Sequence, residues 1–161
     1  MKELQDCIQT RRSVRIYREE PVDRALIRKL IWNGCMAPSG SNIQSWQFIV
    51  ADDPELVAEL VRFSPGIGKV PPCIIILCAD RCRALEKGGV MGRDQLSLID
   101  ISMAAENIIL SAVDHGLGTC AVRSFPAMIL QKILKLPEYI MPELLITLGY
   151  PDRIEKMPPK R

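Results

Sequence analysis

Apolar residues recur every three or four positions in five stretches of the chain, which is the period of an amphipathic helix. The longest stretch covers about residues 94–115, and its apolar residues occupy most of the helix circumference, which is typical of a helix buried on all sides. In a chain this short, part of such a helix is expected to pack against a second subunit, so we predict a dimer. The five helices are predicted from Leu4 to the arginines at 11 and 12, between Asp23 and Gly34, from Pro54 to about Phe63, from about Asp94 to His115, and between Pro126 and Pro137.

Shorter apolar runs predict four strands. Residues Cys73–Ala79 are almost all apolar and rich in isoleucine, which indicates a strand covered on both faces in the middle of a sheet. Gly116 is placed to end the long helix in a left-handed conformation, before a strand that ends at Val122. The other two strands are predicted over Trp46–Ala51 and Leu144–Leu148. Because helices and strands do not alternate strictly, this order favours an α+β sandwich over a doubly wound dinucleotide fold.

Length and charge narrow the class of protein. The 161 residues, of which 48% are hydrophobic, suit one domain over residues 1–161 with a substantial core. A net charge of +2 is too small to indicate nucleic-acid binding. The N-terminus has no apolar signal region, and no window approaches the ~18 uninterrupted apolar residues of a membrane span. We therefore expect a soluble cytoplasmic protein without a nucleic-acid or membrane partner.

The six cysteines predict free thiols and no metal site. They are scattered along the chain, and several lie inside apolar runs. Cys78 and Cys82 supply only two ligands at a spacing of four, without a second pair or a nearby histidine.

Two polar segments carry the candidate chemistry. The first, Arg11 to Arg15, places three guanidiniums and a hydroxyl within five residues, and such forked, permanently charged donors suit a phosphoryl group. The second, Ala37 to Trp46, contains two amide side chains that can donate to and accept from the edge of a flat heterocycle. Taken alone, each has an ordinary alternative: a solvated arginine face, and a helix-to-strand loop whose amides satisfy backbone groups.

Together the two segments resemble the FMN-dependent nitroreductase family, whose members open with an Arg-Arg-Ser-x-Arg-like element followed by an Ala-Pro-Ser-x-x-Asn-x-Gln-Pro-Trp-like loop. The resemblance extends from about residue 8 to the end of the chain, because Gly116–Cys120 and Leu148–Pro151 also match in order. It implies a nitroreductase-like α-β-α sandwich with a mixed, mainly antiparallel sheet. It also implies a homodimer with FMN at the subunit interface.

The phosphate side of FMN is expected at the arginine segment. The resemblance implies that the first arginine, the serine and the last arginine of this segment hold the phosphate and ribitol. The middle arginine would add backbone or side-chain contacts, and cations of the C-terminal tail would return to the phosphate. The residues on this side are Arg11, Arg12, Ser13, Arg15, Lys160 and Arg161.

The ring side of FMN is expected between two other segments. The proline and serine of the second motif would approach the flavin from the other subunit, and its two amides would lie near the isoalloxazine or the ribityl chain. The segment Val122–Ser124 falls where family members place a backbone N–H beside flavin N5. The residues on this side are Pro38, Ser39, Asn42, Gln44, Arg123 and Ser124.

The chain departs from the family pattern at several points. Ser45 stands where the family usually has proline, which predicts a freer loop. Ser124 replaces a common glycine, and Arg123 is a cation where some members carry a carboxylate. The chain is also short and lacks the helical excursion that covers the substrate side in larger members.

The resemblance implies an FMN-dependent NAD(P)H oxidoreductase. The sequence offers no convincing protein nucleophile, carboxylate pair or metal cluster, and a flavin needs none of these to exchange electrons. Its expected reaction is ping-pong hydride transfer through flavin N5, with NADH or NADPH as reductant and nitroaromatic, quinone or similar small molecules as acceptors. Within flavoenzymes, the alternatives are reductive dehalogenation and flavin breakdown on the same scaffold. Outside them, the alternatives are a non-catalytic flavin-binding or storage protein and an interaction domain without a cofactor.

Overall fold

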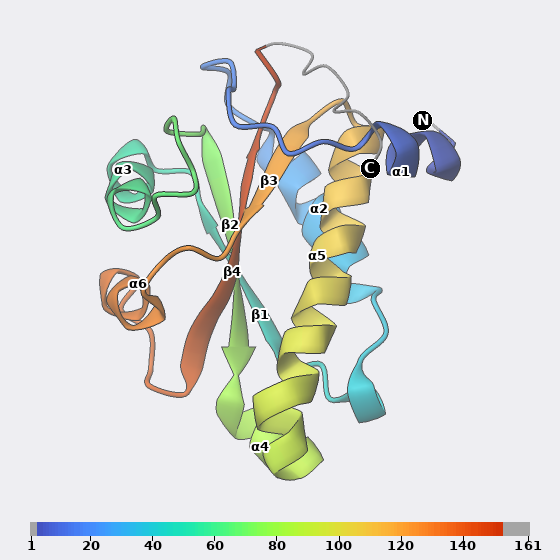
Figure 1. Cartoon of the computed structure of the whole chain (residues 1–161), viewed down its shortest axis with the longest axis vertical. Coiled ribbons are helices and arrows are strands. Elements are labelled where there is room, and N and C mark those ends of the chain that lie inside the picture. The colour runs from blue at the N-terminus through green and yellow to red at the C-terminus, as the bar shows by residue number, and fades with distance from the viewer. Residues whose placement is uncertain (1–2, 153–161) are drawn as a thin grey trace.

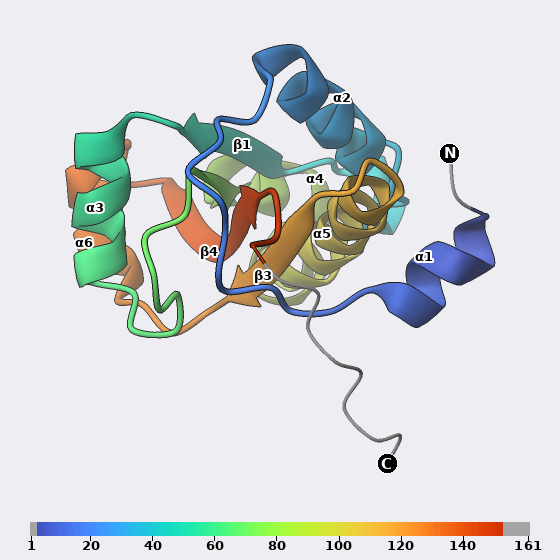
Figure 2. The same cartoon turned by 90° about the horizontal axis from the view of Figure 1, so that it is seen from above.

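A four-stranded sheet lies between two layers of helices. A computed structural model of the chain describes residues 3–152. Figures 1 and 2 show α3 and α6 on one face of the sheet, and α2 and α5 on the other. The strands are β1 Trp46–Ala51, β2 Cys73–Asp80, β3 Gly118–Val122 and β4 Ile140–Gly149. The helices are α1 Leu4–Thr10, α2 Arg24–Cys35, α3 Pro54–Arg62, α4 Arg81–Met91, α5 Ser97–Asp114 and α6 Ala127–Ile133.

The strand order is β1-β2-β4-β3, and each neighbouring pair is antiparallel. The apolar run predicted to lie mid-sheet is the inner strand β2. Among the described residues, the one parallel pairing is an isolated bridge between Ser13 and Thr119, which adds the N-terminal segment to the edge of β3. The predicted α+β sandwich with a mainly antiparallel sheet is confirmed.

Each face of the sheet carries its own hydrophobic core. Side chains alternate along a strand, so Ile75 and Leu77 of β2 join the core under α2 and α5. Ile74 and Ile76 point the other way and join the core under α3 and α6. All four side chains are fully buried, which explains why β2 has no polar face in its sequence.

Two predicted helix boundaries rest on identifiable contacts. The Asp53 carboxylate accepts a hydrogen bond from the Leu56 N–H at 3.0 Å, and Pro54 begins α3 as predicted. Gly116 has a φ of +74° at the end of α5, which is the left-handed cap expected from the sequence.

The predicted helix over residues 94–115 is only part of a longer helical stretch. Before α5 lie α4 and a π-helical turn, Gly92–Leu96, so the helical stretch begins at Arg81. The sequence analysis missed α4 because Ala84 is its one buried residue among the described side chains, which leaves no apolar stripe to detect. A cap was present in the sequence, since Asp80 accepts a hydrogen bond from the Arg83 N–H at 2.9 Å.

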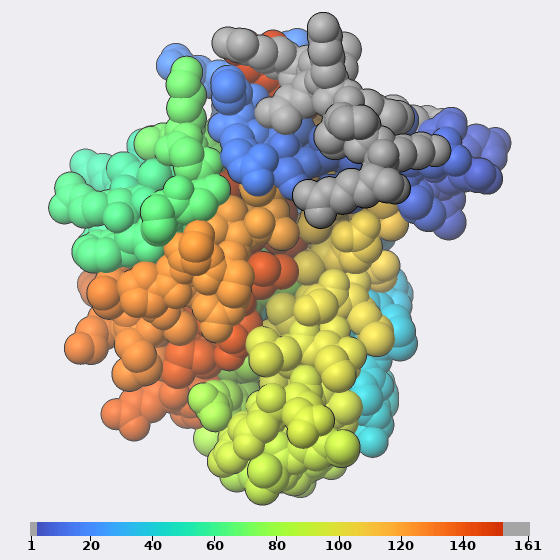
Figure 3. Space-filling view, viewed as in Figure 1, coloured from blue at the N-terminus to red at the C-terminus, as the bar shows by residue number. Residues whose placement is uncertain are grey.

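The sequence predicts that α5 is buried on all sides. In a single chain this is wrong, because one side of the helix is exposed. Leu98, Ile99 and Met103 are 43%, 48% and 43% exposed, and Figure 3 shows α5, in yellow, uncovered at the molecular surface. By length and composition the stretch Arg81–Asp114 could cross a membrane, yet 44% of its most apolar window is buried inside the fold. It is the core helix of the sandwich, with one apolar side left open.

Candidate functional site

The N-terminal arginine segment runs extended along the edge of β3. Ser13 bridges Thr119, and the Val14 N–H donates to the Thr119 carbonyl oxygen at 2.8 Å. Side chains alternate on extended backbone, and the Val14 side chain is buried, so its odd-numbered neighbours point outward. Arg11, Ser13 and Arg15 therefore share one face of the segment, as a common ligand would require.

Arg12 is turned the other way, toward α1. Its Nη1 donates to the Gln9 carbonyl oxygen at 3.0 Å and also to the Arg11 carbonyl oxygen. These bonds satisfy carbonyl groups at the C-terminal end of α1. By contrast, Arg11 and Arg15 form no ion pair with a carboxylate among the described residues. Their charges are available to an anion.

The loop predicted on the ring side contains three residues with left-handed backbone. Ser41, Asn42 and Gln44 have φ values of 50°, 54° and 51°. Residues other than glycine rarely adopt this conformation, and such strain concentrates at functional sites. The Gln44 Nε2 donates to the Asn42 Oδ1 at 2.7 Å, and the Gln44 N–H donates to the Ser39 Oγ at 3.3 Å. The two amides thus form one exposed polar pair, next to the exposed Pro38.

Contacts from α4 and α5 hold this loop in place. The Ile43 side chain is buried and packs directly on Gly88. The Arg83 Nε donates to the Ile43 carbonyl oxygen at 2.8 Å, and the Gly40 N–H donates to the Asp100 Oδ1 at 2.9 Å. Sequence reasoning missed Arg83 and Asp100, because the first lies on the unpredicted α4 and the second is an acid inside an apolar helix.

Ser45, at the usual proline position of the family, is buried and 1% exposed. Its carbonyl oxygen accepts a hydrogen bond from the Asp80 N–H at 2.7 Å. Its hydroxyl oxygen is sealed from solvent and has no partner among residues 3–152. The end of the loop is therefore fixed to β2 by the backbone, without a proline ring.

The segment after β3 is covered by the loop of residues 64–72. Gly66 packs directly on the Ser124 hydroxyl, and a side chain at Gly66 would also meet Val122 at 3.0 Å. This loop therefore contacts the segment that the sequence predicts to lie beside flavin N5. The sequence alone gave no means of assigning that contact, because nothing in residues 64–72 matches a motif.

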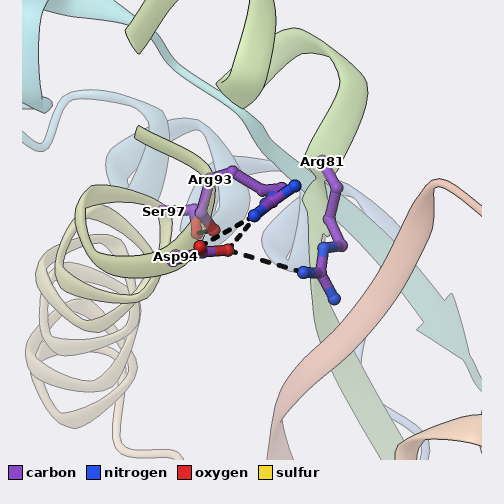
Figure 4. Close-up of polar contacts among 4 residues, drawn as sticks. All are labelled: Arg81, Arg93, Asp94 and Ser97. Atoms are coloured by element: carbon purple, nitrogen blue, oxygen red, sulfur yellow. Dashed lines mark hydrogen bonds and ion pairs between the residues drawn. The ribbon is translucent and has the colours of Figure 1, made fainter. Parts of the chain in front are cut away.

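A series of ion pairs follows the segment after β3, with arginines and carboxylates in turn. The Arg123 Nη2 lies 3.2 Å from the Glu143 Oε2. Burial raises the pKa of Glu143, and the nearby cations Arg123 and Arg81 oppose that rise in part. Arg81 lies 3.6 Å from Asp94, which also pairs with Arg93 through two hydrogen bonds of 2.7 and 2.8 Å (Figure 4). The hydrogen bond from Arg93 lowers the pKa of Asp94.

The two halves of the predicted flavin site lie at opposite ends of α5. The amide loop is tied to Asp100 near the start of the helix, and the arginine segment is tied to Thr119 beyond its end. At about 1.5 Å per residue, Asp100 and Asp114 are about 20 Å apart along the axis. Figure 1 shows the blue N-terminal segment near the end of α5 that leads to β3, and the cyan segment that contains the loop near the other end of the helix. One chain does not bring the halves together, and Lys160 and Arg161 lie outside the described residues.

Comparison with known proteins assigns this arrangement to a family. The model of the Nitroreductase family matches residues 8–69 and 62–150. The chain belongs to the nitroreductase family. A proposed NADH dehydrogenase/NAD(P)H nitroreductase of Methanothermobacter thermautotrophicus is 32% identical over 152 residues, which cover 91% of this chain and 76% of that protein. The NAD(P)H FMN reductase of Bacillus subtilis is 29% identical over 176 residues, which cover 98% of this chain and 70% of that enzyme.

A solved structure agrees with the nitroreductase assignment. The crystal structure of a proposed NADH dehydrogenase/NAD(P)H nitroreductase of Parabacteroides distasonis superimposes with a TM-score of 0.85 at 30% identity. The match covers all of this chain and 94% of the other. Residues 3–152 therefore share the nitroreductase fold.

The cysteines of this nitroreductase-family chain are all free thiols. Cys7, Cys73, Cys78 and Cys120 are buried, and burial raises the pKa of both Cys73 and Cys78 to about 12. Within the described part of the chain, no group of three or more histidine, cysteine, aspartate or glutamate residues could hold a metal ion.

The opposite pKa directions of Glu143 and Asp94 predict opposite responses to acid. A raised pKa contributes stability that is present below the ordinary value of 4.5 and is lost as pH rises through the folded value. We therefore expect the wild type to gain unfolding free energy relative to Glu143→Gln as pH falls from 7 toward 4.5. The measurement is urea unfolding across this pH range, and a constant difference would contradict the assignment.

Asp94→Asn is the matched control. The lowered pKa of Asp94 contributes stability that is present above its ordinary value of 3.8 and is lost as pH falls. The wild type should therefore lose stability relative to Asp94→Asn as pH falls below 3.8 through the lower folded value, so the unfolding series for this pair extends below pH 3.8. Because Asp94 is exposed to solvent, the change should be smaller than that at Glu143 and should shrink in high salt.

Proposed function

We propose that this nitroreductase-family chain, as one domain over residues 1–161, is an FMN-dependent NAD(P)H oxidoreductase that works as a cytoplasmic homodimer. Its substrates are NADH or NADPH and a small electron acceptor such as a nitroaromatic or a quinone. Two observations support the cofactor: the family assignment, and the relative named as an NAD(P)H FMN reductase.

The separation of the two half-sites on α5 carries the proposal. A homodimer with twofold symmetry pairs the same surface of both copies. If the open sides of two α5 helices pack antiparallel, the start of each helix meets the end of the other. Each amide loop then faces the partner's arginine segment, and two complete sites form. The open side of α5, with Leu98, Ile99 and Met103, supplies the apolar surface for this contact.

The residues of the two half-sites fit FMN. Arg11 and Arg15, which have no described carboxylate partner, would hold the phosphate together with the Ser13 hydroxyl. Asn42 and Gln44 bond to each other through one donor and one acceptor. This pairing leaves the remaining amide N–H groups and the Gln44 carbonyl oxygen to meet the polar edge of the flavin or its ribityl chain.

Bound FMN would supply two-electron transfer between NAD(P)H and the acceptor. The chain would orient the two substrates in one cavity in turn and shape the electric field around them. Beside Ser124, Arg123 is paired with Glu143, so this side of the site carries less positive charge than an unpaired arginine would give. The acceptor would therefore be selected more by shape and stacking than by a strong attraction for anions.

The direct test is the visible absorption of purified protein supplied with FMN. The protein should bind about one FMN per chain, and anaerobic NADH or NADPH should bleach the flavin absorption. A quinone or nitroaromatic should then restore the absorption, with parallel double-reciprocal plots in steady state. Bound FMN that neither nicotinamide bleaches would favour the alternative of a flavin-storage protein. Protein that stays colourless with FMN would contradict the proposal altogether.

The dimer is tested by charging the open side of α5. We expect Ile99→Glu with Met103→Glu to shift the protein from twice 18.1 kDa to 18.1 kDa in light scattering, and to weaken FMN binding at least about tenfold. Met128→Glu is the control, because Met128 is 58% exposed but lies on α6, on the opposite layer. Equal masses for the wild type and the double variant would contradict the proposed interface.

A further inference from the structure

Asp100 is a buried acid with a single hydrogen-bond partner. Its side chain is 1% exposed on α5, and its Oδ1 accepts the Gly40 N–H at 2.9 Å. Its Oδ2 is sealed from solvent and has no partner in the described part of the chain. Burial raises the pKa of Asp100, against the opposing effect of the Gly40 N–H. Such a residue costs stability at its position, since a buried polar group is compensated only by its hydrogen bonds.

The hydrogen bond from the Gly40 N–H to Asp100 lies at the start of the strained loop. Gly40 comes directly before the left-handed residues, and its α-carbon lies so close to Leu96 that a Cβ would be 2.9 Å from the leucine side chain. Among the described hydrogen bonds, that of Asp100 is the only one from outside the loop to residues 38–42. The contacts from Arg83 and Asp80 reach the loop only later, at residues 43 and 45.

Strained backbone persists only where its surroundings over-determine it. Without the Asp100 contact, residues 38–42 could relax toward ordinary backbone angles while Ile43 stayed anchored. The Asn42–Gln44 amide pair would then lose its fixed orientation. Asp100 lowers the stability of the fold at its own position, and its hydrogen bond holds the backbone of the loop in a fixed conformation.

We infer that Asp100 is a positioning residue, which fixes the Pro38–Gln44 loop for flavin binding through its single hydrogen bond to the Gly40 N–H. This inference rests on the proposed function. Asp100 does not touch the flavin itself and acts through the loop. The acceptor oxygen is the essential feature, and the negative charge is not.

The main variant is Asp100→Leu, which keeps the branched shape and removes the hydrogen-bond acceptor. Replacing a buried charge by an apolar residue of similar shape is often neutral or stabilising, so the melting temperature should stay equal or rise. The Kd for FMN, measured by quenching of flavin fluorescence, should nevertheless rise about tenfold or more. Asp100→Asn keeps an acceptor oxygen for the Gly40 N–H, and its Kd should stay within about threefold of the wild type.

Ser97→Ala is the matched control on the same helix. Ser97 is also buried, but its hydroxyl donates to the Arg93 carbonyl oxygen within the helix, and no described hydrogen bond joins it to the loop. This variant should lose thermal stability without a change in the Kd for FMN.

The outcomes separate the inference from the proposed function. If wild-type protein binds no FMN, the proposed function fails. If the wild type binds FMN and Asp100→Leu binds it equally well, only the role of Asp100 is overturned. An Asp100→Asn variant as weak as Asp100→Leu would also overturn it, because the charge would then matter more than the acceptor. Should Asp100→Leu not fold, Asp100→Ala replaces it, and failure of both to fold would make Asp100 a stability residue and refute the inference.

Discussion

The length of α5 is the constraint on which the rest of the account depends. A helix rises about 1.5 Å per residue, so the two ends of this one hold their attached segments about 20 Å apart. One end carries the strained amide loop through Asp100, and the other leads into β3, which carries the arginine segment through Thr119. We propose that a ligand that contacts both segments is bound between two chains, and the apolar side of the same helix offers the surface on which the chains can meet.

Neighbouring elements of the fold hold both polar segments in place. The arginine segment can lie against β3 because Gly118 has no side chain, since a Cβ there would lie 2.7 Å from Val14. The amide loop keeps its left-handed residues because Ile43 is inserted against α4 and Gly40 is bound to α5. In the amide loop, the rigid elements around it hold strained backbone in place.

The sequence predicted most of the fold because its strongest patterns are also its core. The apolar run of β2 and the capping residue Asp53 each identified an element correctly. The helix α4 escaped because it is charged and barely buried, so hydrophobic periodicity carries no signal there. The arginine and amide motifs indicated the family correctly, but their roles at a flavin stay predictions. The anchors of the amide loop, Arg83 and Asp100, could not be found from the sequence because they act through contacts between segments far apart in the chain.

A complementation experiment tests the central claim most directly. One chain would carry Arg11→Ala and Arg15→Ala, the other Asn42→Ala and Gln44→Ala, and the mixed dimer would be isolated through two different tags. If each site combines the arginine segment of one subunit with the amide loop of its partner, the mixed dimer has one intact site. It should bind one FMN per two chains with wild-type affinity, while both homodimeric variants bind FMN far more weakly. A mixed dimer that binds FMN no better than the homodimers would show that both segments act within one chain, and would contradict the account.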